Sequence, residues 1–140
     1  GVSQISGASR TSVGGYDKPE AEEDNSAQFD VNDNRSLDEI VNWLLELGYI
    51  PSFCTACYRE GRTGDRFMSL AKTGQIANCC HPNALMTLKE YLEDYASLET
   101  KKIGDRVITE QTLLIPNEKV RGIAKNNLAD IEAGKRDFRF

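Results

Sequence analysis

The chain has 140 residues, of which 39% are hydrophobic and 28% charged, and its formal net charge at pH 7 is −5. This size and composition are typical of one globular domain with a buried core. The negative balance argues against nucleic acid as the main partner, because phosphate binding needs a basic surface. No apolar run approaches the roughly 18 residues of a membrane span, and the first residues lack a secretory-signal pattern, so we expect a cytoplasmic protein.

The amino-terminal part is predicted to contain a strand and a long connection. Residues 1–8 alternate weakly between apolar and polar side chains and lead into a loop that contains Gly14 and Gly15, a strand-then-loop pattern. Because the first residues have the pattern of the middle of a strand, we expect the chain to be a piece of a longer protein. Residues 17–35 are rich in Asp, Glu and Asn, which indicates a long surface connection.

The next segment predicts a helix that ends near Gly48. Ser36 and Glu39 have the spacing of a capping box, and the glycine supplies a stop signal. Between them, apolar residues recur at helical spacing: Leu37, Ile40, Val41, Leu44, Leu45 and Leu47. Residues 49–53 are then predicted to form a short strand, and this order of elements is typical of an α/β unit.

Beyond residue 53, a loop and two helices are predicted. Residues 54–64 contain two cysteines and two glycines and should form the loop, which precedes a short helix over residues 65–72. Pro82, at a first helical turn, opens a stronger helix through about Ser97. The buried stripe of this helix is predicted to contain Leu85, Leu88, Leu92 and either Tyr95 or Ala96.

The carboxy-terminal part is predicted to contain an extended segment and a last helix. Residues 107–108 and 113–115 are β-branched or apolar and are interpreted as strand or extended chain. Asn117 is expected to cap the final helix, which should end before Gly134.

Cysteines form the most informative chemical pattern. In a chain with no export signal, the four cysteines are more typical of metal binding or catalysis than of a disulfide framework. Cys54 and Cys57 lie on one tight loop, and Cys80 lies just before a predicted helix start, where exposed amides favour thiolates. Positive charge in the same region would come from three further residues: Arg59, Arg62 and Arg66.

The spacing of these cysteines leaves the bound species open. Three thiolates would suit an iron–sulfur cluster and would leave one iron open to a non-protein ligand. Adjacent cysteines can seldom point at one centre, which favours Cys80 over Cys79. A structural zinc is also compatible, because Cys79 or His81 could supply a fourth ligand to the three cysteines Cys54, Cys57 and Cys80. A thiol redox protein is a third alternative, although Gly61 and Gly64 follow the Cys-x-x-Cys pair where a thioredoxin-like site would have a helix.

A family resemblance shifts this balance. The run Cys54-Thr55-Ala56-Cys57-Tyr58-Arg59-Glu60-Gly61-Arg62-Thr63-Gly64-Asp65-Arg66-Phe67-Met68, with Gly74-Gln75-Ile76, Pro82-Asn83-Ala84-Leu85 and Glu90-Tyr91-Leu92, closely resembles the tail of the HydG family. These are radical S-adenosylmethionine enzymes that mature iron–iron hydrogenases. Residues 5–11 and 14–16 look like the last barrel strand that this family shares with the thiamine-pathway tyrosine lyase. That lyase lacks the Cys-Thr-Ala-Cys segment, so the segment points to the HydG family.

The resemblance implies an α/β fold class. Residues 1–50 would supply the last strand, loop and helix of a (β/α)8 TIM-type barrel. Residues 51–140 would form a mostly helical carboxy-terminal domain that binds an iron–sulfur cluster. The remainder of the barrel would be a partner within the same protein.

The resemblance also implies an activity for the full-length protein. Family members are lyases that cleave tyrosine and convert one fragment to carbon monoxide and cyanide, which assemble on an additional iron together with cysteine. In this sequence Cys54, Cys57 and Cys80 would bind the auxiliary 4Fe-4S cluster that carries this iron. Arg10 would bind the tyrosine carboxylate or an intermediate through a bidentate pair, with a loop-anchoring salt bridge as its alternative role. Other hydrogenase maturation proteins are the expected macromolecular partners.

One departure from the family limits what this chain can do by itself. The first cluster of the family sits on a Cys-x-x-x-Cys-x-x-Cys motif near the start of the barrel, and the 140 residues contain no such motif. The sites for S-adenosylmethionine and for this second 4Fe-4S cluster are absent with it, so the chain alone is not expected to cleave tyrosine. The non-enzymatic alternative is a zinc-stapled structural or protein-interaction module.

Overall fold

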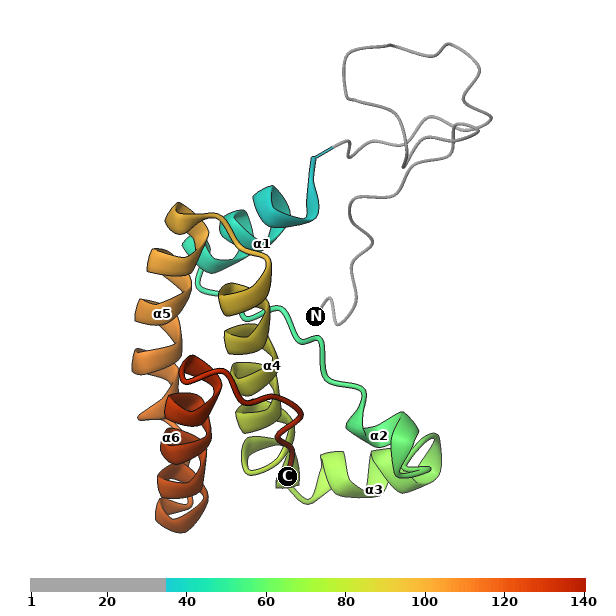
Figure 1. Cartoon of the computed structure of the whole chain (residues 1–140). Helices are drawn as coiled ribbons and strands as arrows, with labels where there is room; N and C mark the ends of the chain where they lie inside the picture. The colour runs from blue at the N-terminus through green and yellow to red at the C-terminus, as the bar shows by residue number, and fades with distance from the viewer. Residues whose placement is uncertain (1–34) are drawn as a thin grey trace, which may run out of the picture.

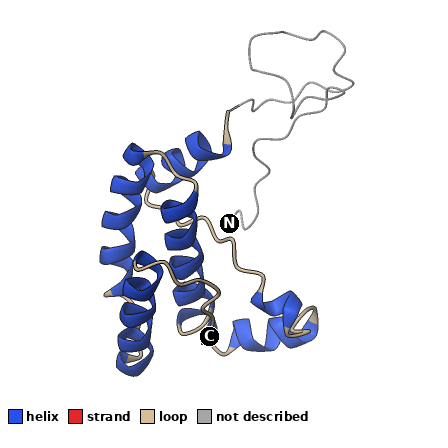
Figure 2. Cartoon of the chain, viewed as in Figure 1, coloured by secondary structure: helices blue, strands red, loops and turns tan. Residues whose placement is uncertain are grey.

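The structure, a computed structural model, describes residues 35–140 and shows helices but no strand within that range (Figures 1 and 2). The elements are α1 (Leu37–Glu46), α2 (Ala56–Arg59), α3 (Asp65–Lys72), the 3₁₀ helix η1 (Gln75–Ala77), α4 (Cys80–Asp94), α5 (Leu98–Thr112) and α6 (Glu118–Glu132). None of these helices is long and apolar enough to cross a membrane.

Helices α4, α5 and α6 form the main body of the described part. α4 packs against both α5 and α6, and α1 packs against α5 at one end of this group (Figure 1). At the opposite end η1 packs against α4, and α2 and α3 extend away from the bundle (Figure 1). The two ends of α4 therefore lie in different surroundings, and the end that carries Cys80 faces the smaller helices.

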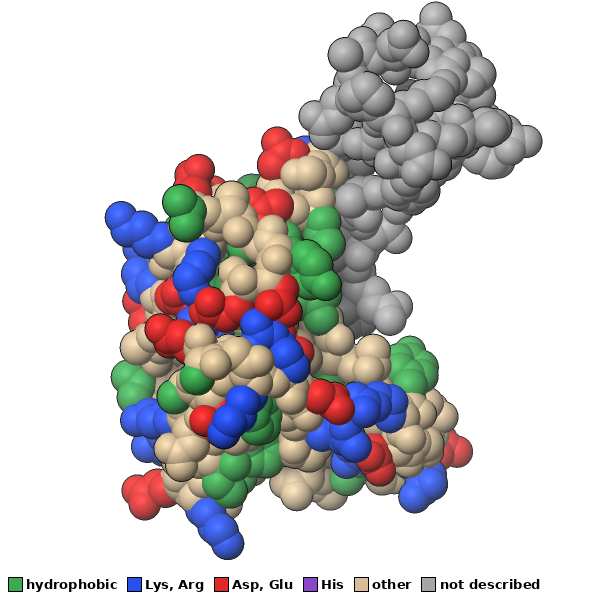
Figure 3. All heavy atoms as spheres, viewed as in Figure 1, with side chains coloured by type: hydrophobic (Ala, Val, Ile, Leu, Met, Phe, Trp, Pro, Cys, Tyr) green, Lys and Arg blue, Asp and Glu red, His purple; other side chains and the backbone are tan. Residues whose placement is uncertain are grey.

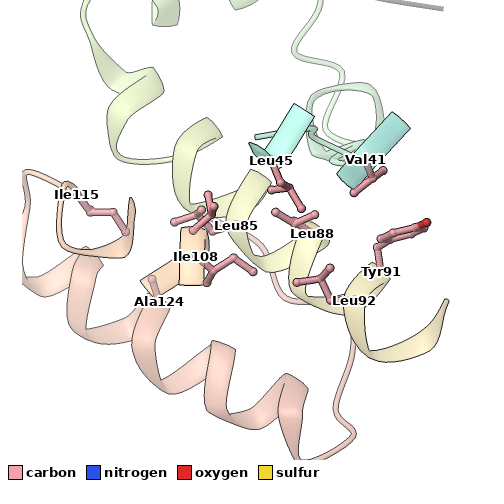
Figure 4. Close-up of a cluster of buried hydrophobic side chains, with 10 residues drawn as sticks. Val41, Leu45, Leu85, Leu88, Tyr91, Leu92, Ile108, Ile115 and Ala124 are labelled. Carbon is pink, nitrogen blue, oxygen red and sulfur yellow. The ribbon is translucent and has the colours of Figure 1, made fainter. Parts of the chain in front are cut away.

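The core is built from the inward stripes of four helices and from the turn between α5 and α6. Its buried members are Val41, Leu45, Leu85, Leu88, Tyr91, Leu92, Val107, Ile108, Ile115 and Ala124 (Figure 4). The stripe predicted for α4 is confirmed at Leu85 and Leu88, which are fully buried, and at Leu92, which is nearly so. Tyr95 and Ala96 lie beyond the end of α4, and Tyr95 is exposed. Burial of this apolar surface is the main term that holds the helices together.

The predicted starts of α1 and α6 are confirmed in atomic detail, whereas α4 begins at Cys80 and not at Pro82. Ser36 and Glu39 form the capping box of α1: the Ser36 backbone N–H donates to Glu39 Oε2 at 2.7 Å, and the Glu39 N–H donates to Ser36 Oγ at 3.3 Å. Asn117 Oδ1 accepts from the backbone N–H groups of Lys119 and Val120 at 3.0 and 3.1 Å. In both cases one side chain satisfies amides that the helix leaves without a partner.

The predicted strand content is wrong for the described residues. Val107 and Ile108 lie inside α5, and residues 113–115 form the turn that follows it. The β-branched residues face the core from α5, so tertiary packing overrides their weak strand preference. Residues 49–53 form no strand, and the predicted loop 54–64 contains the short helix α2.

Hydrogen bonds to Asp38 of α1 connect this helix to α4 and to the start of α5. The Asp38 carboxylate accepts hydrogen bonds from Tyr91 Oη at 3.2 Å, from Ser97 Oγ at 2.8 Å and from Thr100 Oγ1 at 2.9 Å. Burial acts to raise the pKa of Asp38, but these hydrogen bonds outweigh it and hold the pKa below the ordinary value of 3.8. The assignment of residues 1–50 to a barrel stays a prediction, and the predicted strand 1–8 lies outside the described residues.

Candidate metal centre

The four cysteines lie on two neighbouring pieces of chain. Cys54 precedes α2 and Cys57 lies within it, whereas Cys79 directly precedes α4 and Cys80 is its first residue. All four are free thiols and half-buried. The predicted position of Cys80 at a helix start is confirmed, whereas Cys57 lies in a short helix where a loop was predicted.

The Cys54–Cys57 turn is organised by its own backbone. The Ala56 N–H donates to Cys54 Sγ at 3.4 Å, and the Arg62 N–H donates to the Cys57 carbonyl oxygen at 2.8 Å. Gly61 follows with a positive φ of 61°, a conformation that favours glycine and lets the chain reverse after α2. An N–H group directed at a sulfur atom is the type of contact that supports thiolate in a metal site.

Cys80 lies close enough to the other three thiols for their charges to act on it. Burial raises the pKa of the Cys80 thiol to about 12, and the charges of Cys79, Cys57 and Cys54 add to this shift. Cys79 Sγ lies 3.8 Å from Cys80 Sγ. A cation bound among these sulfur atoms would offset the repulsion that opposes ionisation of Cys80.

The thiols lie in the same region of the structure but are not arranged as the ligands of a metal ion. Within residues 35–140, no group of three or more His, Cys, Asp and Glu side chains is arranged to hold a metal ion. The assignment of Cys54, Cys57 and Cys80 as ligands thus stays a prediction. The donor chemistry fits a soft metal centre, because the available donors are free, half-buried sulfur atoms.

One ring nitrogen of His81 is engaged with α5. Its Nε2 lies 3.1 Å from the carbonyl oxygen of Gln111 on α5. A carbonyl oxygen can only accept, so Nε2 carries the proton in this contact and has no lone pair for a metal. This geometry argues against a zinc site that uses His81 through Nε2, whereas Nδ1 of His81 and the thiol of Cys79 stay available as a fourth donor.

Arg59 lies near the cysteine turn, as the sequence predicted, and the charge of Cys54 acts on it. The Arg59 guanidinium donates two hydrogen bonds to the Asp137 carboxylate, at 2.7 and 3.2 Å. Asp137 raises the pKa of Arg59 through this contact and its charge, and the charge of Cys54 contributes further.

Arg62 Nε and Asn78 Oδ1 are buried with no hydrogen-bond partner among the described residues. Such orphaned polar atoms beside the cysteines are compatible with a group that the protein is built to hold.

An open pocket of about 220 Å³ lies beside Cys54. It is lined by Phe53, Cys54, Thr55, Ala56, Arg59, Thr87, Glu90, Asp137, Phe138 and Arg139. Figure 3 shows basic side chains interleaved with acidic ones where α2 meets the carboxy-terminal segment. The sequence analysis missed the contribution of residues 137–139, because contacts between residues so far apart in the chain leave no local pattern.

A solved structure of HydG is similar to this chain over its whole length. That structure is described as HydG, a maturase of the FeFe-hydrogenase; it matches 100% of this chain with 53% sequence identity and a TM-score of 0.89. The resemblance to HydG is confirmed. No protein-family model and no curated protein matches the chain.

The chain corresponds to only a part of the matched HydG chain. The chain spans 30% of the matched HydG chain, and the match is consistent with a carboxy-terminal portion of HydG. The described residues agree with a helical carboxy-terminal domain and contain no part of a barrel sheet. Arg10, the predicted substrate-binding residue, lies outside the described residues, so its role stays a prediction.

Proposed function

We propose that this chain is the cluster-binding part of a hydrogenase maturase and holds an auxiliary 4Fe-4S cluster through Cys54, Cys57 and Cys80. The observation that carries the proposal is the 53% identity with HydG across the whole chain. The free thiols before α2, within α2 and at the start of α4 support it, because sulfur donors are the ligands that iron–sulfur clusters use.

The proposed chemistry belongs to the full-length protein. With three thiolates, the cluster would offer one iron without a protein ligand, where an additional iron would receive carbon monoxide and cyanide made from tyrosine. The barrel would supply the site for S-adenosylmethionine, a second 4Fe-4S cluster and the tyrosine lyase activity. Cysteine would be a further small-molecule partner, and other hydrogenase maturation proteins would receive the product.

The residues described here would hold and tune the centre. The Ala56 N–H would stabilise the Cys54 sulfur as thiolate, because it already donates to Sγ at 3.4 Å. Arg59 would offset part of the negative charge of the cluster and its thiolates, since its guanidinium lies within electrostatic range of Cys54. The aromatic ring of Phe53 stacks on Tyr91 with centroids 5.1 Å apart and fixes the chain directly before Cys54.

Anaerobic reconstitution with iron and sulfide tests the proposal. Wild-type chain should bind about four irons and four sulfides and show a cubane EPR signal on reduction. A Cys54→Ala, Cys57→Ala, Cys80→Ala triple variant should lose both. Cys79→Ala is the matched control, because it removes the neighbouring thiol and should leave the iron content unchanged. Wild-type chain that takes up no iron would contradict the proposal.

A zinc-stapled interaction module is the second candidate. The observation in its favour is that Cys79 Sγ lies 3.8 Å from Cys80 Sγ, while the charges of Cys54 and Cys57 also act on Cys80. Zinc takes four sulfur ligands in structural sites. One tightly held zinc per chain, lost on Cys79→Ala substitution, would support this candidate and exclude the three-cysteine cluster.

A further inference from the structure

The last residues of the chain run back along α4 from its end toward its start (Figure 1). Arg136 donates to the Asp94 carboxylate at 2.9 and 2.5 Å near the end of α4. One turn earlier, the Asp137 N–H donates to Glu90 Oε1 at 2.8 Å. We call residues 136–140 the terminal bracket.

The far end of the terminal bracket is fixed near the start of α4. The Phe140 N–H donates to Asn83 Oδ1 at 2.8 Å, and Asn83 Nδ2 donates to the Phe140 carbonyl oxygen at 3.3 Å. Asn83 is only 3% exposed. A reciprocal amide pair on a buried side chain fixes both the position and the direction of the backbone that it contacts.

The terminal bracket also contacts α2, which carries Cys57. Arg59 makes its bidentate contact with Asp137, and Arg139 lies 3.6 Å from Glu60. Among the described helices, α2 packs extensively against none, whereas α4 packs against α5, α6 and η1. Side-chain contacts with the bracket therefore link the residues after Cys57 to α4. The residue before Cys54 is linked to α4 separately, through the stack of Phe53 on Tyr91.

Asp137 is the residue at which the two sets of contacts meet. Its carboxylate accepts from Arg59 on α2 while its backbone N–H donates to Glu90 on α4. Its φ of 67° lies in the left-handed region, where Asp is tolerated better than most residues. A residue kept in this conformation by contacts on both sides has the features of a specific connector.

We propose that Asp137 is a positioning residue, and that the terminal bracket holds the Cys54–Cys57 turn beside the helix that begins with Cys80. This inference deepens the proposed function, because it rests on these thiols sharing one metal centre. It does not depend on which metal they bind. Bidentate arginine–carboxylate pairs fix geometry as well as charge, which suits this role.

The matched variants differ in one carboxylate. Asp137→Asn keeps the shape and the tolerance of positive φ and removes the charge that Arg59 contacts. Asp130→Asn is the control: it also removes an ion-paired surface carboxylate, because Asp130 contacts Lys135 at 3.1 Å and lies outside the bracket. A third variant exchanges the pair, combining Arg59→Asp with Asp137→Arg.

Metal release is the first readout. Wild-type and variant chains are reconstituted with iron and sulfide, and iron loss to a ferrous chelator is followed by absorbance. We expect Asp137→Asn to lose iron about tenfold faster, as is typical when a residue that orients metal ligands is removed. Asp130→Asn should match wild type, and the exchanged pair should lose iron more slowly than Arg59→Asp or Asp137→Arg alone.

Cobalt(II) binding and hydrogen exchange separate failure of this inference from failure of the proposed function. Cobalt(II) titration, followed by thiolate-to-metal absorption, should show weaker binding in Asp137→Asn. Amide exchange of residues 54–60 in metal-free protein should be faster in that variant. If wild type binds cobalt(II) but no cluster, the proposed function fails, and weaker cobalt(II) binding by Asp137→Asn would still support the bracket. Equal cobalt(II) affinity, iron loss and amide exchange in Asp137→Asn and wild type would overturn the bracket.

Discussion

A close approach between α4 and α5 gives a quantitative test of the packing. Gly104 on α5 faces Leu92 on α4, and a Cβ added at Gly104 would lie 2.4 Å from Leu92 Cδ1, 2.7 Å from Cδ2 and 3.1 Å from Cγ. Leu92 is 1% exposed, so its side chain has no solvent into which it can rotate. Gly104→Ala must therefore move Leu92 or separate α4 from α5.

The expected loss follows from two opposing terms. Overpacking a core by one carbon costs about 1–3 kcal/mol, and replacing a helical glycine by alanine returns about 1 kcal/mol. Because both methyl groups of Leu92 lie closer than any real contact, we expect the upper part of that range to apply. The net loss of unfolding free energy should be about 1–2 kcal/mol.

Gly122 on α6 provides the control. It is an exposed helical glycine whose added Cβ would have no atom within 4 Å. Gly122→Ala should therefore raise the unfolding free energy by about 0.5–1 kcal/mol. Urea unfolding followed by circular dichroism measures both variants. A Gly104→Ala chain as stable as the Gly122→Ala chain would refute the close α4–α5 packing.

Capping and junction contacts give three further predictions. Asn117→Ala should lower the unfolding free energy by about 1 kcal/mol, and Asn117→Ser should restore most of it, as measured by urea unfolding. Folding lowers the pKa of Asp38, so the ionised carboxylate stabilises the folded state. This contribution to the unfolding free energy is complete above pH 3.8 and disappears as the pH falls through the lowered pKa. Acid unfolding of Asp38→Asn should lack this pH-dependent loss of stability. Tyr91→Phe removes the hydroxyl that donates to Asp38 and should raise the pKa of that carboxyl in an NMR titration while the stack on Phe53 persists.

Local signals explain which elements could be predicted from the sequence. Ser36 and Asn117 cap helices through contacts within three residues, so the starts of α1 and α6 are readable from spacing. Residues 65–72 form α3 as predicted. Val107 and Ile108 misled the prediction because strand preference is weak and the core of α5 overrides it.

The candidate site likewise has parts that the sequence predicts and parts that it does not. The Cys54–Cys57 spacing and the position of Cys80 are local features, and they predicted where the thiols lie along the chain. The terminal bracket depends on a contact between Arg59 and Asp137, 78 positions apart. Residue type and spacing do not predict such a pair, because the contact depends on how α4 and α6 pack in the folded chain.

The most direct test of the central claim is the EPR spectrum of the reduced, reconstituted chain with and without carbon-13-labelled cyanide. Three cysteine ligands would leave one iron open, so cyanide should shift the spectrum and carbon-13 should add hyperfine coupling, equally in wild type and in Cys79→Ala. An unchanged spectrum in wild type, together with loss of the cluster in Cys79→Ala, would show a closed centre held by four cysteines and would contradict the account.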